Sequence, residues 1–192
     1  MKKLLILLFS ILISFNSYGE TETYYYENGQ IKSERNYNEW YEYDGKWTGW
    51  YKDGQIRFEG NYKYDKYDGK WTSWYKNGQK QLEENYKDGE FDGKWTDWYE
   101  NGQIKLEINY KDDKADGKWT RWYESGQKNW EGNYKDDKQD GKWTFWYKNG
   151  QKMKEENFKD GKDDGKWTEW YENGQKKQEG NFKDGECISG DC

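Results

Sequence analysis

The pattern Asp-Gly-Lys-Trp-Thr-x-Trp-Tyr recurs along this chain at a constant interval of 24 residues. Its six copies begin at Asp44, Asp68, Asp92, Asp116, Asp140 and Asp164. A short period without insertions or deletions is typical of architectures in which each unit stacks on its neighbours. Near-identical units leave little room for the asymmetric pocket that catalysis needs. The period therefore favours a binding or scaffolding protein over an enzyme.

Each repeat has the pattern of one β-hairpin. In the second full copy, Asn77-Gly78 separates two aromatic-containing runs, 70–76 and 79–86. Asn-Gly is a strong signal for a two-residue type I′ turn, in which both central residues have positive φ. The equivalent dipeptides are Asp53-Gly54, Asn101-Gly102, Ser125-Gly126, Asn149-Gly150 and Asn173-Gly174. We predict an all-β fold, an elongated and twisted single-layer antiparallel meander of tandem 24-residue hairpins.

A two-residue loop would place alternate residues of each hairpin on opposite sides of the sheet. One side, the aromatic face, would carry Trp71, Ser73, Tyr75, Lys80, Leu82, Glu84 and Tyr86. The other, the Trp-row face, would carry Lys70, Thr72, Trp74, Lys76, Gln79, Gln81, Glu83 and Asn85. Because 21% of the residues are aromatic while the mean hydropathy is −1.62, stacked rings are expected to replace an aliphatic core.

The start of the chain has the features of a signal peptide. Two lysines precede an apolar stretch over 4–15, which is followed by the small residues Ser17 and Gly19. We predict a leader over 1–19 that is cleaved near Gly19, so that the protein is exported to the periplasm, the cell surface or the medium. The apolar stretch is too short for a membrane span, and no stable membrane insertion is expected.

The rest of the chain divides into three parts. Residues 20–43 resemble a partial copy and are expected to cap the array, whereas 44–187 hold the six repeats. Residues 188–192 form a tail. Cys187 and Cys192 are expected to pair in a disulfide, as suits an exported protein; a frayed tail with two free thiols is the alternative.

One repeat carries the residues of a known motif. They are Tyr99, Gly102, Gln103, Glu107, Asn109, Tyr110, Gly117 and Trp119. This pattern resembles the MORN repeat, and in particular the bacterial variant found in proteins named YwqK-type antitoxins, over roughly 24–185. The resemblance implies elongated hairpin sheets that mediate protein or lipid contacts and keep catalysis in a separate domain. It also hints at an antitoxin-like or immunity-like role.

The residue types argue against catalysis. Histidine is absent, so the commonest general acid and base is missing. A carboxylate recurs at Glu59, Glu83, Glu107, Glu131, Glu155 and Glu179, and we expect each to bond to a Thr or Lys on the neighbouring strand. Acidic links such as 112–117 interleave lysines with the aspartates, so solvated turns are favoured over calcium sites. No catalytic residue, metal or cofactor is predicted.

The charge balance limits the partners. Without the two leader lysines, 30 basic and 38 acidic side chains remain, a net charge of about −8. Nucleic acid and anionic membrane surfaces select for an excess of Lys and Arg. Neither is therefore expected as a partner.

A recurring tryptophan on the Trp-row face is one candidate binding surface. The Trp row consists of Trp50, Trp74, Trp98, Trp122, Trp146 and Trp170. Such a ladder could stack sugar rings or hold a choline-like cation. The alternative is that each ring simply packs on the side chains of its neighbours.

Positions that escape the repeat supply a second candidate. The predicted partner patch on the aromatic face comprises Phe58, Leu82, Ile104, Leu106, Ile108 and Trp130, and its main column turns polar in the last two copies. Such a patch is either covered by curling of the sheet or open to a partner. The leading hypothesis is an exported repeat protein that binds another protein or itself. The second is a module that binds carbohydrate or cell wall through the Trp row.

Overall fold

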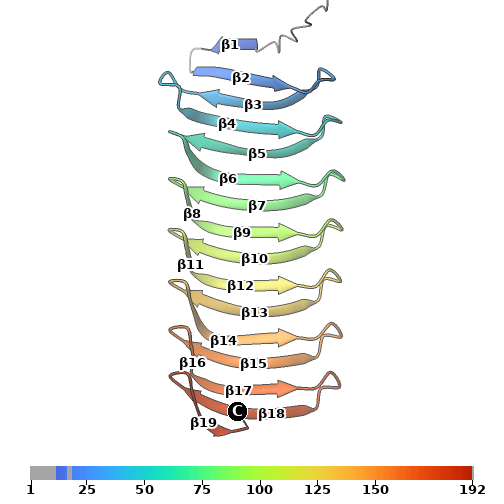
Figure 1. Ribbon diagram of the computed structural model, residues 1–192, viewed down its shortest axis with the longest axis vertical. Helices are drawn as coiled ribbons and strands as arrows, with labels where there is room; N and C mark the ends of the chain where they lie inside the picture. The colour runs from blue at the N-terminus through green and yellow to red at the C-terminus, as the bar shows by residue number, and fades with distance from the viewer. Residues whose placement is uncertain (1–11, 17–18, 192) are drawn as a thin grey trace, which may run out of the picture.

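The computed structural model describes residues 12–16 and 19–191, and the side chains of 19–191. Every regular element in these ranges is a β-strand, and the nineteen strands form one sheet. Figure 1 shows the strands following one another along the long axis as a single layer, with no second layer on either side. The predicted all-β, single-layer antiparallel meander is confirmed.

The strands are β1 (Leu12–Asn16), β2 (Gly19–Tyr25), β3 (Ile31–Tyr37), β4 (Tyr43–Trp50), β5 (Ile56–Lys63), β6 (Lys66–Trp74), β7 (Lys80–Lys87), β8 (Glu90–Phe91), β9 (Gly93–Trp98), β10 (Ile104–Lys111), β11 (Lys114–Ala115), β12 (Gly117–Trp122), β13 (Lys128–Lys135), β14 (Lys138–Trp146), β15 (Lys152–Lys159), β16 (Lys162–Asp163), β17 (Gly165–Trp170), β18 (Lys176–Lys183) and β19 (Glu186–Gly190). Strands that follow one another along the chain pair antiparallel, except that β8, β11 and β16 do not pair with β9, β12 and β17, which pair instead with β7, β10 and β15. The pairs β8 with β9, β11 with β12 and β16 with β17 each replace one longer strand, interrupted at a single aspartate.

The turn at Asn77-Gly78 differs from the prediction. The Tyr75 N–H donates to the Gln79 carbonyl over 2.8 Å and the Gly78 N–H donates to the Tyr75 carbonyl over 3.0 Å. Within the dipeptide only Gly78 has positive φ, at 83°. This is a type I turn followed by a left-handed glycine that forms a bulge, not a type I′ turn.

Type I′ turns do occur, but at the opposite edge of the sheet, in the links between hairpins. Lys63 pairs with Lys66 across Tyr64 and Asp65, whose φ values are 50° and 61°. The other links have two consecutive residues with positive φ at Asp88-Gly89, Asp112-Asp113, Asp136-Asp137, Asp160-Gly161 and Asp184-Gly185. Short polar side chains and glycine tolerate this conformation, which explains the acidic composition of the links.

Hydrogen bonds from one repeat to the next explain the fixed columns of the sequence. The hydroxyl of Tyr75, at the start of one hairpin turn, donates to the Trp98 carbonyl of the next repeat over 2.8 Å. The same bond joins Tyr26 to Trp50, Tyr51 to Trp74, Tyr99 to Trp122, Tyr123 to Trp146 and Tyr147 to Trp170. Asn77 adds a bond to the Glu100 carbonyl over 2.7 Å. An insertion would break this alignment, so the period is strictly kept.

Burial is greatest in the middle of the sheet. The threonine of each repeat is among the most buried residues, at Thr48, Thr72, Thr96, Thr120, Thr144 and Thr168. On the aromatic face Trp71 and Trp143 are buried because each lies over a glycine of the preceding strand, Gly60 or Gly132, where an added Cβ would come within 2.1 Å of the indole. Their Nε1 groups then reach the backbone carbonyls of Asn61 and Asn133.

The two ends differ from the repeats. Strand β1 lies within the predicted leader and pairs with β2, which begins at the last leader residue, Gly19. Residues 1–11 and 17–18 of the leader lie outside the described ranges. At the other end β19 pairs with β18, and Cys187 is disulfide-bonded. Its predicted partner, Cys192, lies outside the described residues.

Candidate binding surfaces

The Trp row runs along one face of the sheet, and every ring in it is half-buried. A lysine of the preceding repeat lies over several of these rings: Lys80 Nζ is 5.5 Å from the centroid of Trp98, and Lys128 is equally far from Trp146. Lys152 lies 5.8 Å from Trp170 in the same way. These cation–π contacts occupy part of the surface that a stacking ligand would need.

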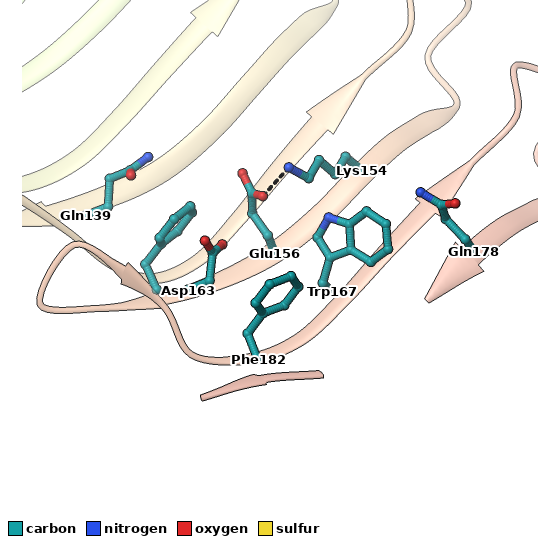
Figure 2. A pocket seen from close by; sticks show the side chains of 8 residues that line it. Gln139, Lys154, Glu156, Asp163, Trp167, Gln178 and Phe182 are labelled. Carbon is teal, nitrogen blue, oxygen red and sulfur yellow. Dashed lines mark ion pairs between the residues drawn. The ribbon is translucent and has the colours of Figure 1, made fainter. Parts of the chain in front are cut away.

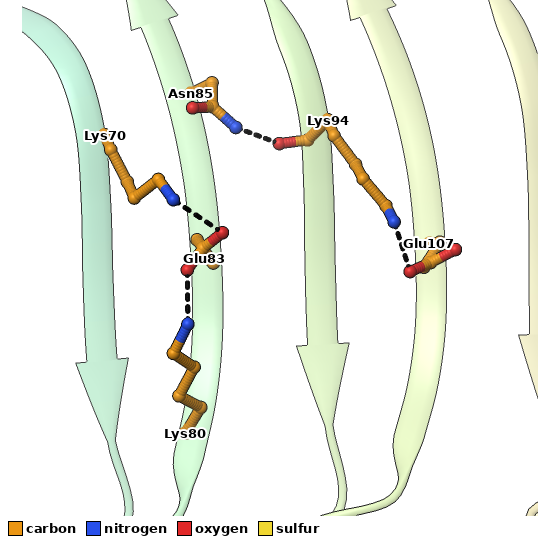
Figure 3. A network of polar contacts seen from close by, with 6 residues as sticks. All are labelled: Lys70, Lys80, Glu83, Asn85, Lys94 and Glu107. Atoms are coloured by element: carbon orange, nitrogen blue, oxygen red, sulfur yellow. Dashed lines mark hydrogen bonds and ion pairs between the residues drawn. The ribbon is translucent and has the colours of Figure 1, made fainter.

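A ladder of ion pairs lies beside the Trp row (Figure 3). Lys70 Nζ lies 3.1 Å and Lys80 Nζ 2.6 Å from carboxylate oxygens of Glu83. Burial alone would raise the pKa of the Glu83 carboxyl, but hydrogen bonds from the two lysines outweigh it and lower that pKa. The pair Lys94–Glu107 continues the ladder. The recurring glutamates thus bond to lysines.

The bulge at each hairpin turn moves one column of the predicted patch to the other face. Lys80 was expected on the aromatic face, yet it contacts Glu83 and Trp98, which lie on the Trp-row face. Ile104 occupies the same register position one repeat later and pairs with Trp98 as Lys80 pairs with Trp74. The placement of Ile104 with the aromatic-face residues was therefore wrong. The extra residue of the turn places Ile104 opposite Trp98, and a register shift between Ile104 and Leu106 restores the predicted alternation from Leu106 onward.

The rest of the predicted patch stays on the aromatic face. Phe58, Leu82, Leu106 and Trp130 are half-buried there, whereas Ile108 is only 5% exposed. Ile108 is therefore a core residue and offers almost no surface to a partner. The four half-buried side chains remain accessible.

The first half of the aromatic face, up to Tyr110, carries an unbroken row of rings, here called the ring row. It runs through Tyr37, Tyr43, Tyr62, Tyr67, Tyr86, Phe91 and Tyr110, with successive centroids 4.7–5.4 Å apart. Burial among these rings raises the pKa of the Tyr62 and Tyr86 hydroxyls. Each inner ring of the row thus packs between two others, and all seven rings remain partly exposed.

In the second half the ring row is interrupted. The column that holds Tyr43, Tyr67 and Phe91 continues as Ala115, Gln139 and Asp163. A pocket of about 580 Å³ opens there, here called the C-terminal pocket (Figure 2). Its lining consists of the rings of Phe158, Trp167 and Phe182 and the polar side chains of Gln139, Lys154, Glu156, Asp163 and Gln178. Sequence reasoning missed this pocket, although that column and the polar Lys154 and Gln178 signalled it.

The acidic links have a structural use. The Asp113 carboxylate accepts the Phe91 N–H of the preceding link over 2.6 Å, and Asp137 accepts that of Ala115 over 2.8 Å. Among the described residues no group of three or more acidic, His or Cys side chains could hold a metal ion. No helix in the same ranges is long and apolar enough to cross a bilayer.

Comparison with known proteins identifies one repeat family along the whole array. The family model described as MORN repeat variant matches seven segments of the chain, 21–39, 43–64, 67–88, 91–112, 115–136, 139–160 and 163–184. These segments cover most of the sequence, and the first corresponds to the partial copy. No curated protein sequence matches the chain.

Proposed function

Because the chain belongs to the MORN repeat variant family, a family of repeats that often serve as binding modules, we propose that it is an exported, non-catalytic protein that binds another protein. The partner docks on the first half of the aromatic face, over the ring row and the neighbouring column of Phe58, Leu82 and Leu106. An antitoxin-like or immunity-like role is one form that such binding would take.

The observation that carries this proposal is that the ring row lies on an open face. Figure 1 shows no second layer of strands over this face among the described residues, and Tyr67 remains 37% exposed in the middle of the row. Interface centres are rich in tyrosine and other aromatic residues, because large rigid rings bury much area with little loss of conformational entropy. A sheet face with seven adjacent rings fits that description.

Export is supported by the predicted leader and by the disulfide at Cys187. The acidic net charge supports a partner other than nucleic acid or an anionic membrane. The absence of catalysis is supported by the repeated use of glutamate in ion pairs, as at Glu83, where two lysines hold the carboxyl ionised. A tuned general acid would need a raised pKa.

Binding of sugars along the Trp row is the second hypothesis. The lysines over Trp98, Trp146 and Trp170 favour a structural role for these rings. Replacing Trp98 and Trp122 with alanine tests it. Unchanged binding to cell-wall polysaccharide by a folded variant would reject the Trp row as a sugar site.

Photocrosslinking tests the protein-binding proposal. A photoreactive residue at Leu106, on the aromatic face, should capture a specific partner from the envelope fraction of the source cells, whereas one at Ile104, on the opposite face, should not. Leu82→Glu combined with Leu106→Glu should abolish the complex. Ile104→Lys is the matched control, since lysine occupies the equivalent position at Lys80, and it should leave the complex intact. Equal capture from both faces, or a complex that survives the double variant, would contradict the proposal.

A further inference from the structure

The C-terminal pocket arises where polar side chains replace rings. In the first half Tyr67 pairs with Tyr62 and Phe91 with Tyr86, and the rings fill the face. At the equivalent pairs of the second half, Gln139 faces Tyr134 and Asp163 faces Phe158. The shorter polar side chains leave the hollow of about 580 Å³, which lies within the size range of small-molecule sites.

An exchange of partners distinguishes the tryptophan of this pocket from its equivalent in the first half. Trp95 Nε1 donates to Glu84 Oε1 over 3.0 Å. Glu156 is the counterpart of Glu84, but it is paired with Lys154 instead (Figure 2). Within the described ranges Trp167 Nε1 makes no hydrogen bond. The indole nitrogens that are both buried and unbonded belong to Trp47 and Trp119, so the Trp167 nitrogen is accessible. The Trp167 indole thus presents an N–H donor beside the pocket.

The charges of the lining exclude two classes of ligand. An anion would be repelled by two carboxylates, Glu156 and Asp163, and the one lysine of the lining is already paired with Glu156. A cation would compete with the Lys154 ammonium, which lies 6.0 Å from the Trp167 centroid and pairs with Glu156, one of the two carboxylates of the lining. A neutral ligand avoids both conflicts.

The remaining features describe that neutral ligand. The Trp167 and Phe182 rings are inclined at 77° to each other with centroids 6.4 Å apart, so they form an apolar corner. Around it lie hydrogen-bonding groups of both kinds: the indole N–H, the Gln139 amide, the Asp163 carboxylate and the Gln178 carbonyl oxygen. The Gln178 amide nitrogen is already used, since it donates to Glu169 over 3.2 Å.

We infer that the C-terminal pocket binds a neutral sugar ring. One apolar face of the ring stacks in the corner of Trp167 and Phe182, and its hydroxyls, each both donor and acceptor, bond to Asp163, Gln139 and the indole N–H. This site is separate from the Trp row and from the ring row, so it does not depend on the proposed protein partner.

Saturation-transfer NMR with cellobiose, maltose, chitobiose and laminaribiose tests the inference on the full mature chain. At least one of these sugars should receive saturation from the wild-type protein. The variant Gln139→Tyr with Asp163→Phe rebuilds the ring pairs of the first half and should fold, yet bind that sugar about tenfold more weakly or not at all. Trp98→Ala, in the Trp row, should bind it as the wild type does.

Three results would overturn the inference. They are no transfer to any of the four sugars, equal transfer in the filled variant, and a loss of transfer in Trp98→Ala alone. Thermal unfolding of the filled variant distinguishes a blocked pocket from an unfolded sheet. The photocrosslinking result at Leu106 is independent of this outcome.

Discussion

The two halves of the aromatic face share a backbone and differ in what covers it. In the first half Trp71 is surrounded by Trp47, Phe58, Tyr62 and Tyr67. In the second half Trp143 is also enclosed by rings, but Trp167 in the last repeat has one ring neighbour, Phe182, and a lysine. The same scaffold thus supports a closed layer of rings at one end and an open polar pocket at the other.

The difference shows how a repeat array acquires distinct surfaces. The hydrogen bonds that stack one repeat on the next use columns that hardly vary, such as Tyr75 and its equivalents. The column of Tyr67, Gln139 and Asp163 makes no such bond with its side chain, so it can change without disturbing the stack. Ligand specificity in this protein is therefore expected in the columns that do not hold the sheet together.

Removing one indole should distinguish the first half from the last repeat, and this is the largest effect expected. Trp71→Ala deletes a buried ring and its bond to the Asn61 carbonyl, and we expect it to lower the free energy of unfolding by about 3–5 kcal/mol. Trp167→Ala should lower it by less, because this ring is half-exposed. Urea unfolding followed by circular dichroism measures both. Equal losses would mean that the surroundings of Trp71 and Trp167 are equally packed.

The tyrosine hydroxyls that bond to the next repeat should stabilise both halves equally, and the tyrosine of the last repeat should contribute less. Tyr75→Phe and Tyr147→Phe each remove one bond to a carbonyl of the next repeat and should each cost about 0.5–1.5 kcal/mol. The Tyr171 hydroxyl forms no such bond within the described residues and its side chain is 50% exposed, so Tyr171→Phe is the matched control. A loss at Tyr171 as large as at Tyr147 would show that the effect does not come from stacking.

Sequence reasoning found the parts of this structure that repeat. The period and the glycine of each hairpin predicted the meander, and pairing of Lys70 with Asn85 through Ser73 with Leu82 follows the predicted register. The turn type was wrong because Asn-Gly suits both a type I′ turn and a type I turn with a bulge. Only the hydrogen-bond pattern distinguishes the two turn types. The longer turn places Ile104 opposite Trp98, on the Trp-row face instead of the aromatic face.

The C-terminal pocket was harder to predict for a different reason. It depends on residues from five strands, β14 to β18. It also depends on the ion pair of Glu156 with Lys154, which leaves the indole of Trp167 without that carboxylate as an acceptor. One column of Tyr, Tyr, Phe, Ala, Gln and Asp indicated that rings give way to polar groups. Nothing in a single strand shows that the space they leave remains open.

Filling the pocket should make the second half behave like the first. Gln139→Tyr with Asp163→Phe restores two ring pairs, and aromatic pairs contribute about 0.5–1.5 kcal/mol each beyond the area they bury. We expect a higher unfolding midpoint in urea and slower hydrogen exchange in β14 to β17. The conservative double variant Gln139→Asn with Asp163→Asn adds no ring and should give no gain. A filled variant less stable than the wild type would show that the backbone of the two halves differs.

Acid should weaken the second half more than the first, although the effect is the smallest expected here. Ion pairs or hydrogen bonds lower the pKa of Glu131, Glu155, Asp164 and Glu179 in the second half, but only of Glu22 and Glu83 in the first.

The sign of this effect follows from those directions. A carboxyl whose folded-state pKa is lowered stabilises the fold above its ordinary pKa of about 4.5, and this stabilisation is lost as the pH falls through the lower folded value. Lys176 and Lys166 lower the pKa of Glu179 to about 2, so the loss there should occur between about pH 4.5 and pH 2. Hydrogen exchange resolved by strand between pH 5 and pH 2.5 should show protection falling faster in β17 and β18 than in β4 and β5. Glu179→Gln should reduce that difference, because an amide does not titrate, and an unchanged difference would assign it to other groups.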